Sequence, residues 1–326
     1  MNECPFVSVI VLNWNGEAYV HKCLDSLLEQ TYPNYEVIVV DNGSTDGSVE
    51  LLKCYLPRIR LILNQENLGF AAGNNVAIKE ADGEFVVLFN NDAVAHKGWL
   101  ERLVAGALIP PHADIASGPI YFYEPSDVIW SAGQRIDMLT GICWLLSQYS
   151  RHFEPSDDID YLAGCALLIR KPVFDEIGLL DERFFFYSED VDFCLRAKRA
   201  GFNLRLIPGA TVWHMVPMGP KRPSVRVQHH HFKTEFKLML KLWPLWCLPL
   251  TFMLRLTIIP IAYVLLLRYQ FSHPIIVWRA FLAALAEWRR DGLRRDYSKD
   301  LPLHIRIVEV LRVLAEALRR RAQIAS

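Results

Sequence analysis

The chain lacks the patterns that mark several classes of protein. None of its seven cysteines forms a C-x-x-C pair, and its net charge at pH 7 is only -1. Scattered cysteines indicate buried thiols in a reducing compartment, and the balanced charge gives no general attraction to nucleic acid. The first apolar run, Phe6–Leu12, is too short for a secretory signal and stops at Asn13. No basic, glycine-rich phosphate loop lies near the N-terminus, which disfavours a nucleotidyltransferase.

The first third of the chain alternates short apolar runs with segments of helical periodicity. Apolar runs at 7–12, 36–40, 60–63 and 85–89 predict buried strands, and the segments between them predict helices. This alternation is typical of an α/β fold with a mostly parallel sheet and covering helices. With 326 residues, the chain can form one large domain or two smaller ones.

Polar residues directly follow three of the predicted strands. Asn13, Asp41 and Asp92 each stand at or just past a strand end, where open α/β sheets bind their ligands. Asp41 could hydrogen-bond a ribose or a base, and the triplet Asn90-Asn91-Asp92 could hold a divalent cation and, through it, a diphosphate. The alternative for each is a turn or a helix cap, because Asn and Asp are favoured there. Their common position at one sheet edge favours a shared binding site.

A second acidic cluster, Glu189, Asp190 and Asp192, follows four consecutive aromatic residues at 184–187. Acids at the start of a helix gain from the helix dipole, and Asp192 can pair with a basic residue one turn on. The aromatic surroundings favour a further role, because low polarity raises the proton affinity of a carboxylate and suits a general base. His214 follows an apolar run and is interpreted either as a structural histidine or as a metal ligand.

In order and spacing, these segments resemble inverting family 2 glycosyltransferases of the GT-A fold. The similar branch is the one that holds bacterial rhamnosyltransferases and related polysaccharide enzymes. The resemblance covers roughly the first two-thirds of the chain, and its motifs are specific together although each alone is weak. The matching segments are 7–15 (VSVIVLNWN), 39–47 (VVDNGSTDG), 67–75 (NLGFAAGNN), 88–92 (LFNND), 186–192 (FYSEDVD) and 213–214 (WH).

The resemblance implies where the sugar donor binds. The end of the first strand, together with Asp41, would hold the nucleoside, and Asp46 and Asn67 would line the donor pocket. The expected donor-binding residues are therefore Asn13, Asn15, Asp41, Asp46, Asn67 and Asn91.

The resemblance also implies a metal site and a base. The triplet at 90–92 stands at the family's D-x-D position, with Asp92 as the carboxylate that binds Mg²⁺ or Mn²⁺ and His214 completing the site. Asp190, in the Glu189-Asp190 pair, would deprotonate the acceptor hydroxyl. Asn90 stands where many relatives have Asp, which removes one formal charge from the expected metal site.

The composition changes near residues 217–223. We therefore expect a catalytic domain over residues 1–222, with a donor half at about 1–110 and an acceptor half at about 111–222, and a helical membrane-associated region over 223–326. Lys233, Lys237 and Lys241 recur every four residues beside apolar side chains, which predicts a membrane-surface helix with a basic edge.

Two further segments of this region carry expectations of their own. The apolar run 246–267 contains Arg255 and two prolines, which favours broken helices in the bilayer interface over one span. The alternative for this run is a pair of core helices that cover the catalytic domain. The segment 301–321 predicts a final amphipathic helix.

The expected activity is metal-dependent, inverting transfer of a sugar from a nucleotide-diphosphate donor, such as dTDP-rhamnose or a UDP-sugar, to a lipid-linked or polysaccharide acceptor. No nucleophile–base pair is evident, which favours direct displacement. We expect the enzyme at the cytoplasmic face of the cell membrane, with homo-oligomerisation left open. The alternative from another class is a non-catalytic, membrane-anchored subunit that binds sugar nucleotides or acts as a scaffold, and the Glu189-Asp190 pair argues against it.

Overall fold

The computed structural model describes residues 4–153, 158–218, 224–260 and 272–291. By its internal contacts the chain divides into two compact units, a larger one of residues 1–135 with 145–220 and a smaller one of residues 136–144 with 221–326. The predicted helix at 301–321, and the end of the apolar run 246–267, lie outside the described residues.

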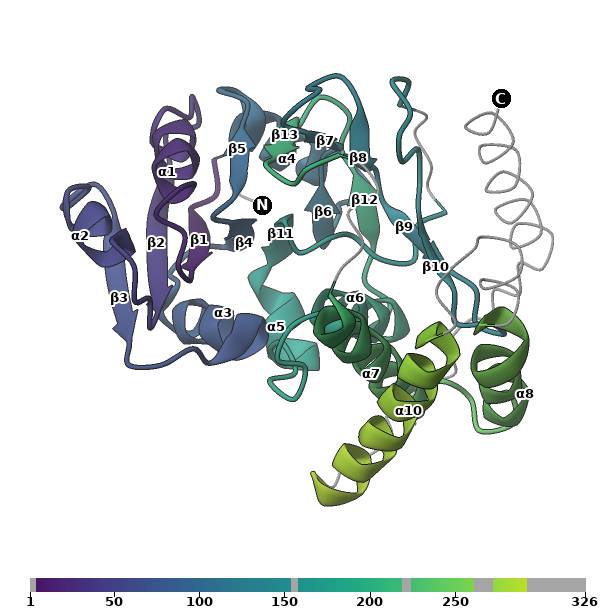
Figure 1. Cartoon of the computed structure of the whole chain (residues 1–326). Coiled ribbons are helices and arrows are strands. Elements are labelled where there is room, and N and C mark those ends of the chain that lie inside the picture. Colours follow the sequence, from purple (N-terminus) through teal and green to yellow (C-terminus); the bar gives the residue numbers. More distant parts are fainter. Residues whose placement is uncertain (1–3, 154–157, 219–223, 261–271, 292–326) are drawn as a thin grey trace, which may run out of the picture. The chain divides into compact units, whose positions relative to one another are not determined.

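Within the described residues, the larger unit is built on a seven-stranded sheet with the order β12-β6-β11-β4-β1-β2-β3 (Figure 1). At its centre β1 (Val7–Asn13) runs parallel to β4 (Phe85–Asn90) on one side and to β2 (Tyr35–Asn42) on the other. β3 (Arg60–Asn64) continues in parallel beside β2. The four strands predicted from apolar runs are therefore confirmed, and their carboxyl ends meet at one edge of the sheet.

The other half of the sheet contains a strand of reversed direction. β11 (Ala166–Arg170) runs antiparallel to both of its neighbours, β4 and β6 (Ile115–Ser117). β12 (Leu204–Leu206) then pairs in parallel with β6. The predicted α/β class is confirmed, and the sheet is mixed because of β11.

Helices cover both faces of this sheet. Successive residues of a strand point to opposite faces, and the side chains on each face pack into a separate core. In β1, Val9 and Val11 pack into one core while Ile10 packs into the other. The first core is completed by α1 (Val20–Leu28), α2 (Ser48–Lys53) and α4 (Trp99–Leu108). The second core is completed by α3 (Gly69–Glu80), α5 (Lys171–Ile177) and α6 (Glu189–Ala200). Burial on both faces explains why β1 and β4 are continuous apolar runs.

A smaller sheet stands beside the main one in the same unit. Its order is β5-β13-β7-β8, and its strands are β5 (Ala93–Ala95), β13 (Val212–His214), β7 (Ile120–Phe122) and β8 (Ile129–Ser131). β5 begins directly after the Asn90-Asn91-Asp92 triplet and pairs antiparallel with β13, so that Ala93 faces His214. β9 (Gln134–Ile136) and β10 (Cys143–Leu145) form a further two-stranded sheet.

Beyond residue 223, the described part of the smaller unit is mainly helical. It contains α7 (Val225–Leu242), α8 (Leu248–Met253), the π-helical turn η1 (Leu254–Ile258) and α10 (Ser272–Arg290). α7 and α10 pack together through Phe236 and Phe281, whose ring centroids lie 5.2 Å apart, and Phe252 lies 5.1 Å from Phe281. No helix in the described ranges is both long enough and apolar enough to cross a bilayer.

The lysines of α7 do not form the basic membrane edge that their spacing predicted. Lys237 and Lys241 are buried, with 2% and 6% of their surface exposed. Lys233 and Lys237 form ion pairs of 2.7 and 3.0 Å with Glu287 of α10. That prediction is wrong because Lys237 and Lys241 are buried, and Glu287 pairs Lys233 and Lys237 with the neighbouring helix.

Candidate active site

The first part of the site joins Asp92 and His214, which are 122 residues apart in sequence. Asp92 lies in the short link between β4 and β5, and the pairing of β5 with β13 brings His214 alongside it. His214 Nε2 lies 3.0 Å from Asp92 Oδ1, and the amide of Met215 donates to the carbonyl of Asp92 at 2.8 Å. The ring of Trp130 meets the His214 ring edge-on, with centroids 4.6 Å apart.

The surroundings of Asp92 keep it ionised. Burial raises the pKa of its carboxyl, but the hydrogen bond and charge of His214, together with a hydrogen bond from Asn90, outweigh burial, so that the pKa lies below its ordinary value. His214 is itself buried, and its Nδ1 has no hydrogen-bond partner among the described residues. The site thus offers one anionic oxygen and one imidazole nitrogen side by side.

These two groups fit a divalent cation that is shared with a substrate. Among the residues that the structure describes, no group of three or more His, Cys, Asp or Glu side chains could hold a metal by itself. Mg²⁺ is usually held by one or two carboxylates plus substrate phosphates and water rather than by an all-protein cage. Asp92 and His214 therefore match a cation whose other ligands come from a diphosphate.

A chain of side-chain hydrogen bonds leads from this link into the sheet. Asn91 Nδ2 donates to Asn13 Oδ1 at 2.9 Å, and Asn13 Nδ2 donates to Asp41 Oδ2 at 2.8 Å. Asp41 Oδ1 accepts from the backbone N–H of Ser44 at 2.9 Å. Gly16 makes room for this chain, since a Cβ there would lie 2.2 Å from Asn91 Nδ2 and 2.3 Å from Asn13 Oδ1. Asn13 and Asp41 are both buried beneath the surface.

The loops after β1 and β2 hold each other in place. Asn15 Oδ1 accepts from the Thr45 N–H at 2.8 Å, and Ser44 Oγ accepts from the Asn15 N–H at 2.8 Å. The exposed Asp46 accepts from the N–H groups of Ser48 at 3.0 Å and Glu17 at 3.1 Å. Although slight burial raises the pKa of Asp46, a hydrogen bond from the Ser48 hydroxyl and these two N–H groups lower it below its ordinary value. Asp46 thus ties the start of α2 to the first loop.

Asn67 stands at the start of α3. Its Oδ1 accepts from Asn42 Nδ2 at 3.0 Å and from the Gly69 N–H at 2.8 Å. Gly69 has φ +83°, and a Cβ there would lie 2.4 Å from the carbonyl oxygen of Phe185. Only glycine meets both demands, and its presence lets the aromatic segment before α6 lie directly on the start of α3.

The acidic cluster forms the first turn of α6, as predicted. The Asp190 carboxylate accepts from the N–H groups of Gly164 at 3.0 Å and Val191 at 2.8 Å. Burial, together with the charges of Asp190 and Asp192, raises the pKa of Glu189 well above its ordinary value. Asp192 is fully buried and pairs with Arg196 at 2.8 Å, the helical contact that the sequence predicts.

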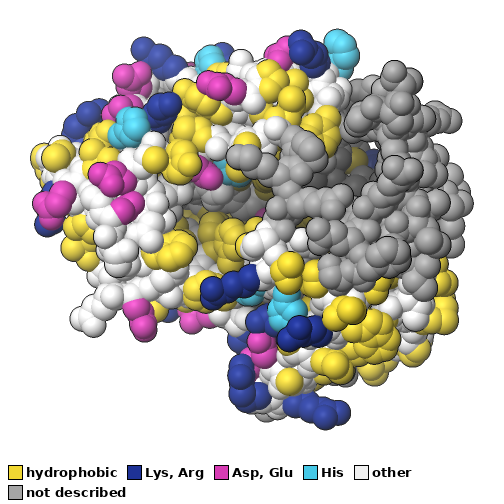
Figure 2. All heavy atoms as spheres, in the orientation of Figure 1, with side chains coloured by type: hydrophobic (Ala, Val, Ile, Leu, Met, Phe, Trp, Pro, Cys, Tyr) yellow, Lys and Arg dark blue, Asp and Glu magenta, His cyan; other side chains and the backbone are white. Residues whose placement is uncertain are grey.

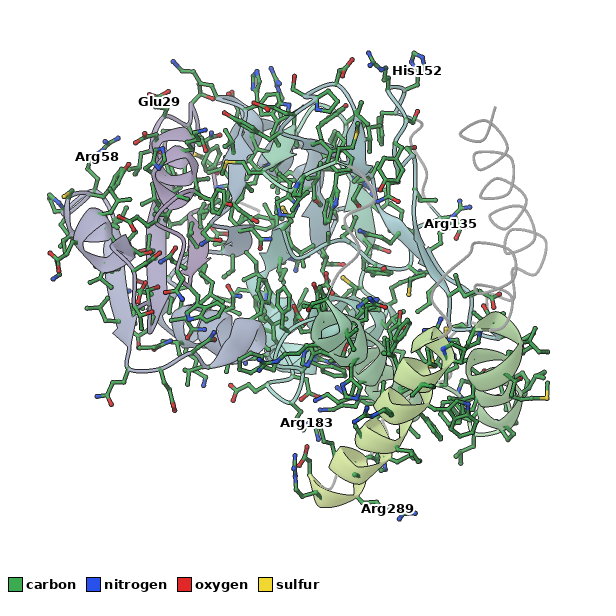
Figure 3. The ribbon with its side chains drawn as sticks, viewed as in Figure 1. Glu29, Arg58, Arg135, His152, Arg183 and Arg289 are labelled. Carbon is green, nitrogen blue, oxygen red and sulfur yellow. The ribbon has the colours of Figure 1, made fainter. Side chains whose placement is uncertain are left out.

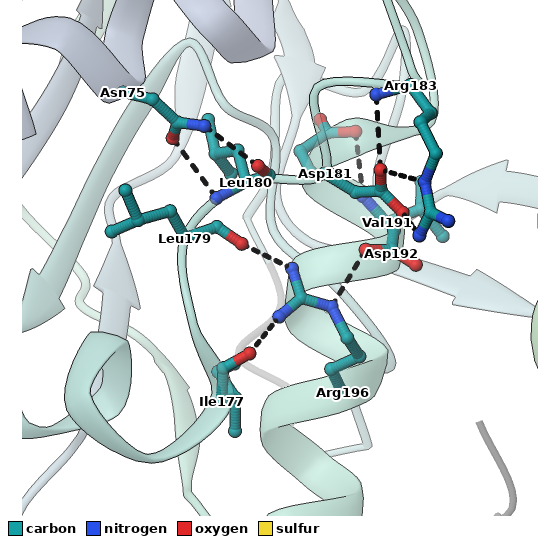
Figure 4. A network of polar contacts seen from close by, with 10 residues as sticks. Asn75, Ile177, Leu179, Leu180, Asp181, Arg183, Val191, Asp192 and Arg196 are labelled. Carbon is teal, nitrogen blue, oxygen red and sulfur yellow. Dashed lines mark hydrogen bonds and ion pairs between the residues drawn. The ribbon is translucent and has the colours of Figure 1, made fainter. Parts of the chain in front are cut away.

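The segment before α6 is held from both sides (Figure 4). The Arg196 guanidinium donates to the carbonyls of Ile177 and Leu179 at 2.6 and 2.8 Å. Asn75 of α3 brackets Leu180, donating to its carbonyl at 2.9 Å and accepting from its N–H at 3.2 Å. These contacts hold residues 177–180 against α6 and α3.

Two non-glycine residues just before α6 have left-handed backbones. Tyr187 and Ser188 have φ values of +70° and +72°. Each such residue costs about 1–3 kcal/mol, and strain of this kind persists where the surroundings impose it, most often at functional sites. The strained backbone just before α6 therefore supports a functional role for the Asp190 carboxylate.

The structure thus joins Asn13, Asp41 and Asn91 by hydrogen bonds and pairs Asp92 with His214, and the adjacent positions of Asn91 and Asp92 link the two groups. Asp190 lies on a separate element, α6. It also reveals supporting residues that the sequence did not single out. Ser44 and Asn75 lie inside the segments that match the family. A polar residue within such a segment is the signal that could have identified them. Trp130 lies between 114 and 160, where the sequence gives no such signal.

The family assignment follows from comparison with known proteins. The model of the family described as "Glycosyl transferase family 2" matches residues 8–178, which is just over half of the chain. The chain belongs to that family. It is accordingly a glycosyltransferase.

Individual proteins show the same similarity. An N-acetylglucosaminyl-diphospho-decaprenol L-rhamnosyltransferase of Mycobacterium tuberculosis is 28% identical over 272 residues, covering 76% of this chain and 88% of the relative. The solved structure of S. aureus TarS 1-349 with UDP-GlcNAc has a TM-score of 0.56 at 20% identity, over 88% of this chain and 83% of that one. The mannosyltransferase PcManGT of Pyrobaculum calidifontis, solved with GDP-Man and Mn²⁺, has a TM-score of 0.53 at 20% identity, over 88% and 76%. The fold of this family member is therefore GT-A-like, as predicted.

Proposed function

We propose that the chain is a metal-dependent, inverting glycosyltransferase of cell-surface glycan synthesis. It moves a sugar from a nucleotide-diphosphate donor to a lipid-linked or polysaccharide acceptor. The observation that carries this proposal is the contact between Asp92 and His214, in which an anionic oxygen and an imidazole nitrogen lie 3.0 Å apart at the end of β4. A donor diphosphate is the substrate group that such an incomplete cation site suits.

The residues divide the chemistry between two elements. The loops at Asn15 and Asp41 hold the nucleoside, and Asp92 and His214 hold the cation. When bound, the cation neutralises the charge that develops on the departing diphosphate. Asp190 accepts the proton of the acceptor hydroxyl while that oxygen bonds to the anomeric carbon and the bond to the diphosphate breaks. One displacement of this kind inverts the anomeric configuration.

The named relatives guide the choice of substrates. The mycobacterial relative is named for transfer of L-rhamnose to an N-acetylglucosaminyl-diphospho-lipid, and TarS was solved with UDP-GlcNAc. We take dTDP-rhamnose and UDP-sugars as the first donors and a sugar linked by diphosphate to a lipid as the first acceptor. The acceptor's lipid implies that the enzyme works at a membrane surface, on the cytoplasmic side.

An exposed apolar surface of the smaller unit supports membrane contact. Figure 2 shows hydrophobic side chains gathered over α8 and α10. At the far end of α10, the exposed Arg289 extends outward (Figure 3) and could meet anionic head groups. The exposed large apolar residues of α8, η1, α10 and the segment before α8 are Leu245, Trp246, Leu250, Met253, Ile258, Ile275, Trp278 and Leu282. Trp side chains favour the boundary between lipid and water, so we propose that this surface lies against the bilayer.

The proposed activity is tested with purified protein, Mn²⁺, radiolabelled nucleotide sugars and N-acetylglucosamine linked by diphosphate to a short alkyl chain. The wild type should glycosylate the acceptor, and Asp190→Asn should lose transfer while still binding the donor. Asp175→Asn, on the exposed face of α5, serves as the matched control and should keep full activity. Transfer that survives in Asp190→Asn removes the base assignment. Donor binding without transfer by the wild type favours a non-catalytic subunit.

A further inference from the structure

Two large aromatic side chains stand exposed next to the proposed base. Phe185 and Phe186 are 47% and 44% exposed, whereas the preceding Phe184 is fully buried. Phe184 accordingly accounts for the packing of this segment in the core. Apolar side chains that gather on the surface suit contact with a ligand or a partner.

The geometry ties these rings to Asp190. A Cβ placed on Gly164 would lie 3.5 Å from Asp190 Cβ and 3.4 Å from Phe70 Cζ, so Phe70 and Asp190 flank the same glycine. The Phe186 ring lies 6.5 Å from the Phe70 ring and 4.1 Å from the Tyr187 ring, measured between centroids. Phe70, Phe186 and Tyr187 therefore form an aromatic group, called here the aromatic platform, at the side of the acid.

The aromatic platform is held rigidly. The Phe70 N–H donates to the carbonyl of Phe185 at 2.6 Å, which fastens the segment to the start of α3. The left-handed backbones of Tyr187 and Ser188 then set the direction of the Phe186 ring relative to Asp190. A ring fixed in advance loses little freedom when a ligand packs on it, which favours binding.

We propose that Phe186 stacks on the acceptor sugar ring that carries the attacking hydroxyl. This inference rests on the proposed function, because the base must lie within hydrogen-bond reach of that hydroxyl. The sugar that bears the hydroxyl is consequently the part of the acceptor nearest to Asp190 and its neighbours. The C–H face of a sugar ring complements the negative face of an aromatic ring. Phe186 is thus a specificity-determining residue for the acceptor.

The test compares three substitutions of Phe186, assayed with Mn²⁺, the donor that supports wild-type transfer, and N-acetylglucosamine linked by diphosphate to a short alkyl chain. Phe186→Tyr keeps a flat ring and should behave as wild type. Phe186→Leu keeps apolar character without a flat ring and should raise the acceptor KM about three- to tenfold, the worth of an aromatic contact, with donor KM unchanged. Phe186→Asn should raise it at least as much. Tyr19→Leu is the matched control, since Tyr19 is also 44% exposed and precedes α1, which packs on the other core.

The possible outcomes separate this inference from the proposed function. If the wild type transfers no sugar, the proposed function fails and the inference fails with it. If the wild type is active and the acceptor KM of Phe186→Leu is unchanged, the inference alone is overturned. If Leu is tolerated but Asn is not, Phe186 contacts the lipid chain of the acceptor, and stacking on the sugar is rejected.

Discussion

Asn13 and Asp41 are hydrogen-bonded across two parallel strands, with Asn13 Nδ2 2.8 Å from Asp41 Oδ2. Both side chains are buried, and the other end of the Asn13 amide accepts from Asn91. One amide thus connects Asn91, the residue before the proposed metal ligand Asp92, to Asp41, the carboxylate proposed to hold the nucleoside. The two ends of the proposed donor site are therefore connected by a side chain that lies beneath the surface.

We predict that Asn13→Ala weakens binding of UDP, GDP or dTDP in the presence of Mn²⁺ about tenfold. The substitution leaves Asn91 and Asp41 without their shared partner, and an unsatisfied buried group costs about 1–3 kcal/mol. Isothermal titration calorimetry measures the affinity. Asn34→Ala, which removes a 2.8 Å bond to the Cys4 carbonyl, is the control and should leave nucleotide affinity unchanged. Equal affinities in Asn13→Ala and wild type would remove Asn13 from the donor site.

We predict that Asp92→Asn abolishes the manganese dependence of nucleotide binding. Asn keeps the size of the side chain and a polar contact with His214 but removes the anionic oxygen. Thermal shifts with UDP, GDP and dTDP, with and without MnCl₂, measure the effect, because a ligand that binds only the folded chain raises Tm. Asp175→Asn should respond to Mn²⁺ as the wild type does. A normal manganese response in Asp92→Asn places the cation elsewhere.

We predict that Glu189→Gln gains stability over the wild type as the pH rises. Burial, with the charges of Asp190 and Asp192, raises the pKa of Glu189 well above its ordinary value. In the unfolded chain the carboxyl group of Glu189 loses its proton near pH 4.3, about the ordinary pKa of Glu, whereas in the folded chain it keeps that proton. Wild-type stability therefore falls with rising pH, and Gln has no such titration. Tm differences between about pH 5 and pH 8 should widen in favour of Glu189→Gln, and a constant difference contradicts the raised pKa.

We predict that Glu287→Gln destabilises the smaller unit. It removes the carboxylate that pairs with Lys233 and with the buried Lys237. Because Glu287 itself is only partly buried, we expect a loss of about 1–3 kcal/mol, the cost of leaving a buried donor unsatisfied. Although burial raises the pKa of Glu287, the two lysines outweigh burial and lower it. The stabilisation is thus present above the ordinary Glu range and lost as the pH falls through the lowered pKa.

Urea unfolding measures this loss, with the exposed Arg289→Gln as control. The double variant Lys237→Met/Glu287→Gln should recover part of the stability, because the buried charge is then gone. A single Glu287→Gln variant as stable as the wild type would show that the pair contributes nothing.

The central strands could be predicted because their signal is local. The apolar run at 85–89 becomes β4, and Asn90 ends it, since a strand buried on both faces must be apolar throughout. The reversed direction of β11 could not be predicted, because an apolar run reads the same in either direction. The three-residue strands β5 and β13 are too short to show periodicity, yet their pairing brings His214 to Asp92.

Side-chain partners far apart in sequence were equally beyond prediction. The spacing of Lys233, Lys237 and Lys241 defines one helix face but not the residues that this face contacts. In the structure, Lys233 and Lys237 pair with Glu287. Likewise, the position of Asn13 at a strand end was predicted, whereas the use of both ends of its amide by Asp41 and Asn91 was not. The motifs predicted which residues belong to the candidate site, whereas the contacts between those residues became known only from the fold.

The most direct test of the proposed function is the configuration of the product. The purified chain is incubated with Mn²⁺, dTDP-rhamnose or a UDP-sugar, and N-acetylglucosamine linked by diphosphate to a short alkyl chain, and NMR determines the new anomeric centre. Metal-dependent, inverting transfer predicts a product of configuration opposite to the donor's and no product when EDTA replaces Mn²⁺. A product that retains the donor's configuration, or turnover undiminished by EDTA, would contradict it.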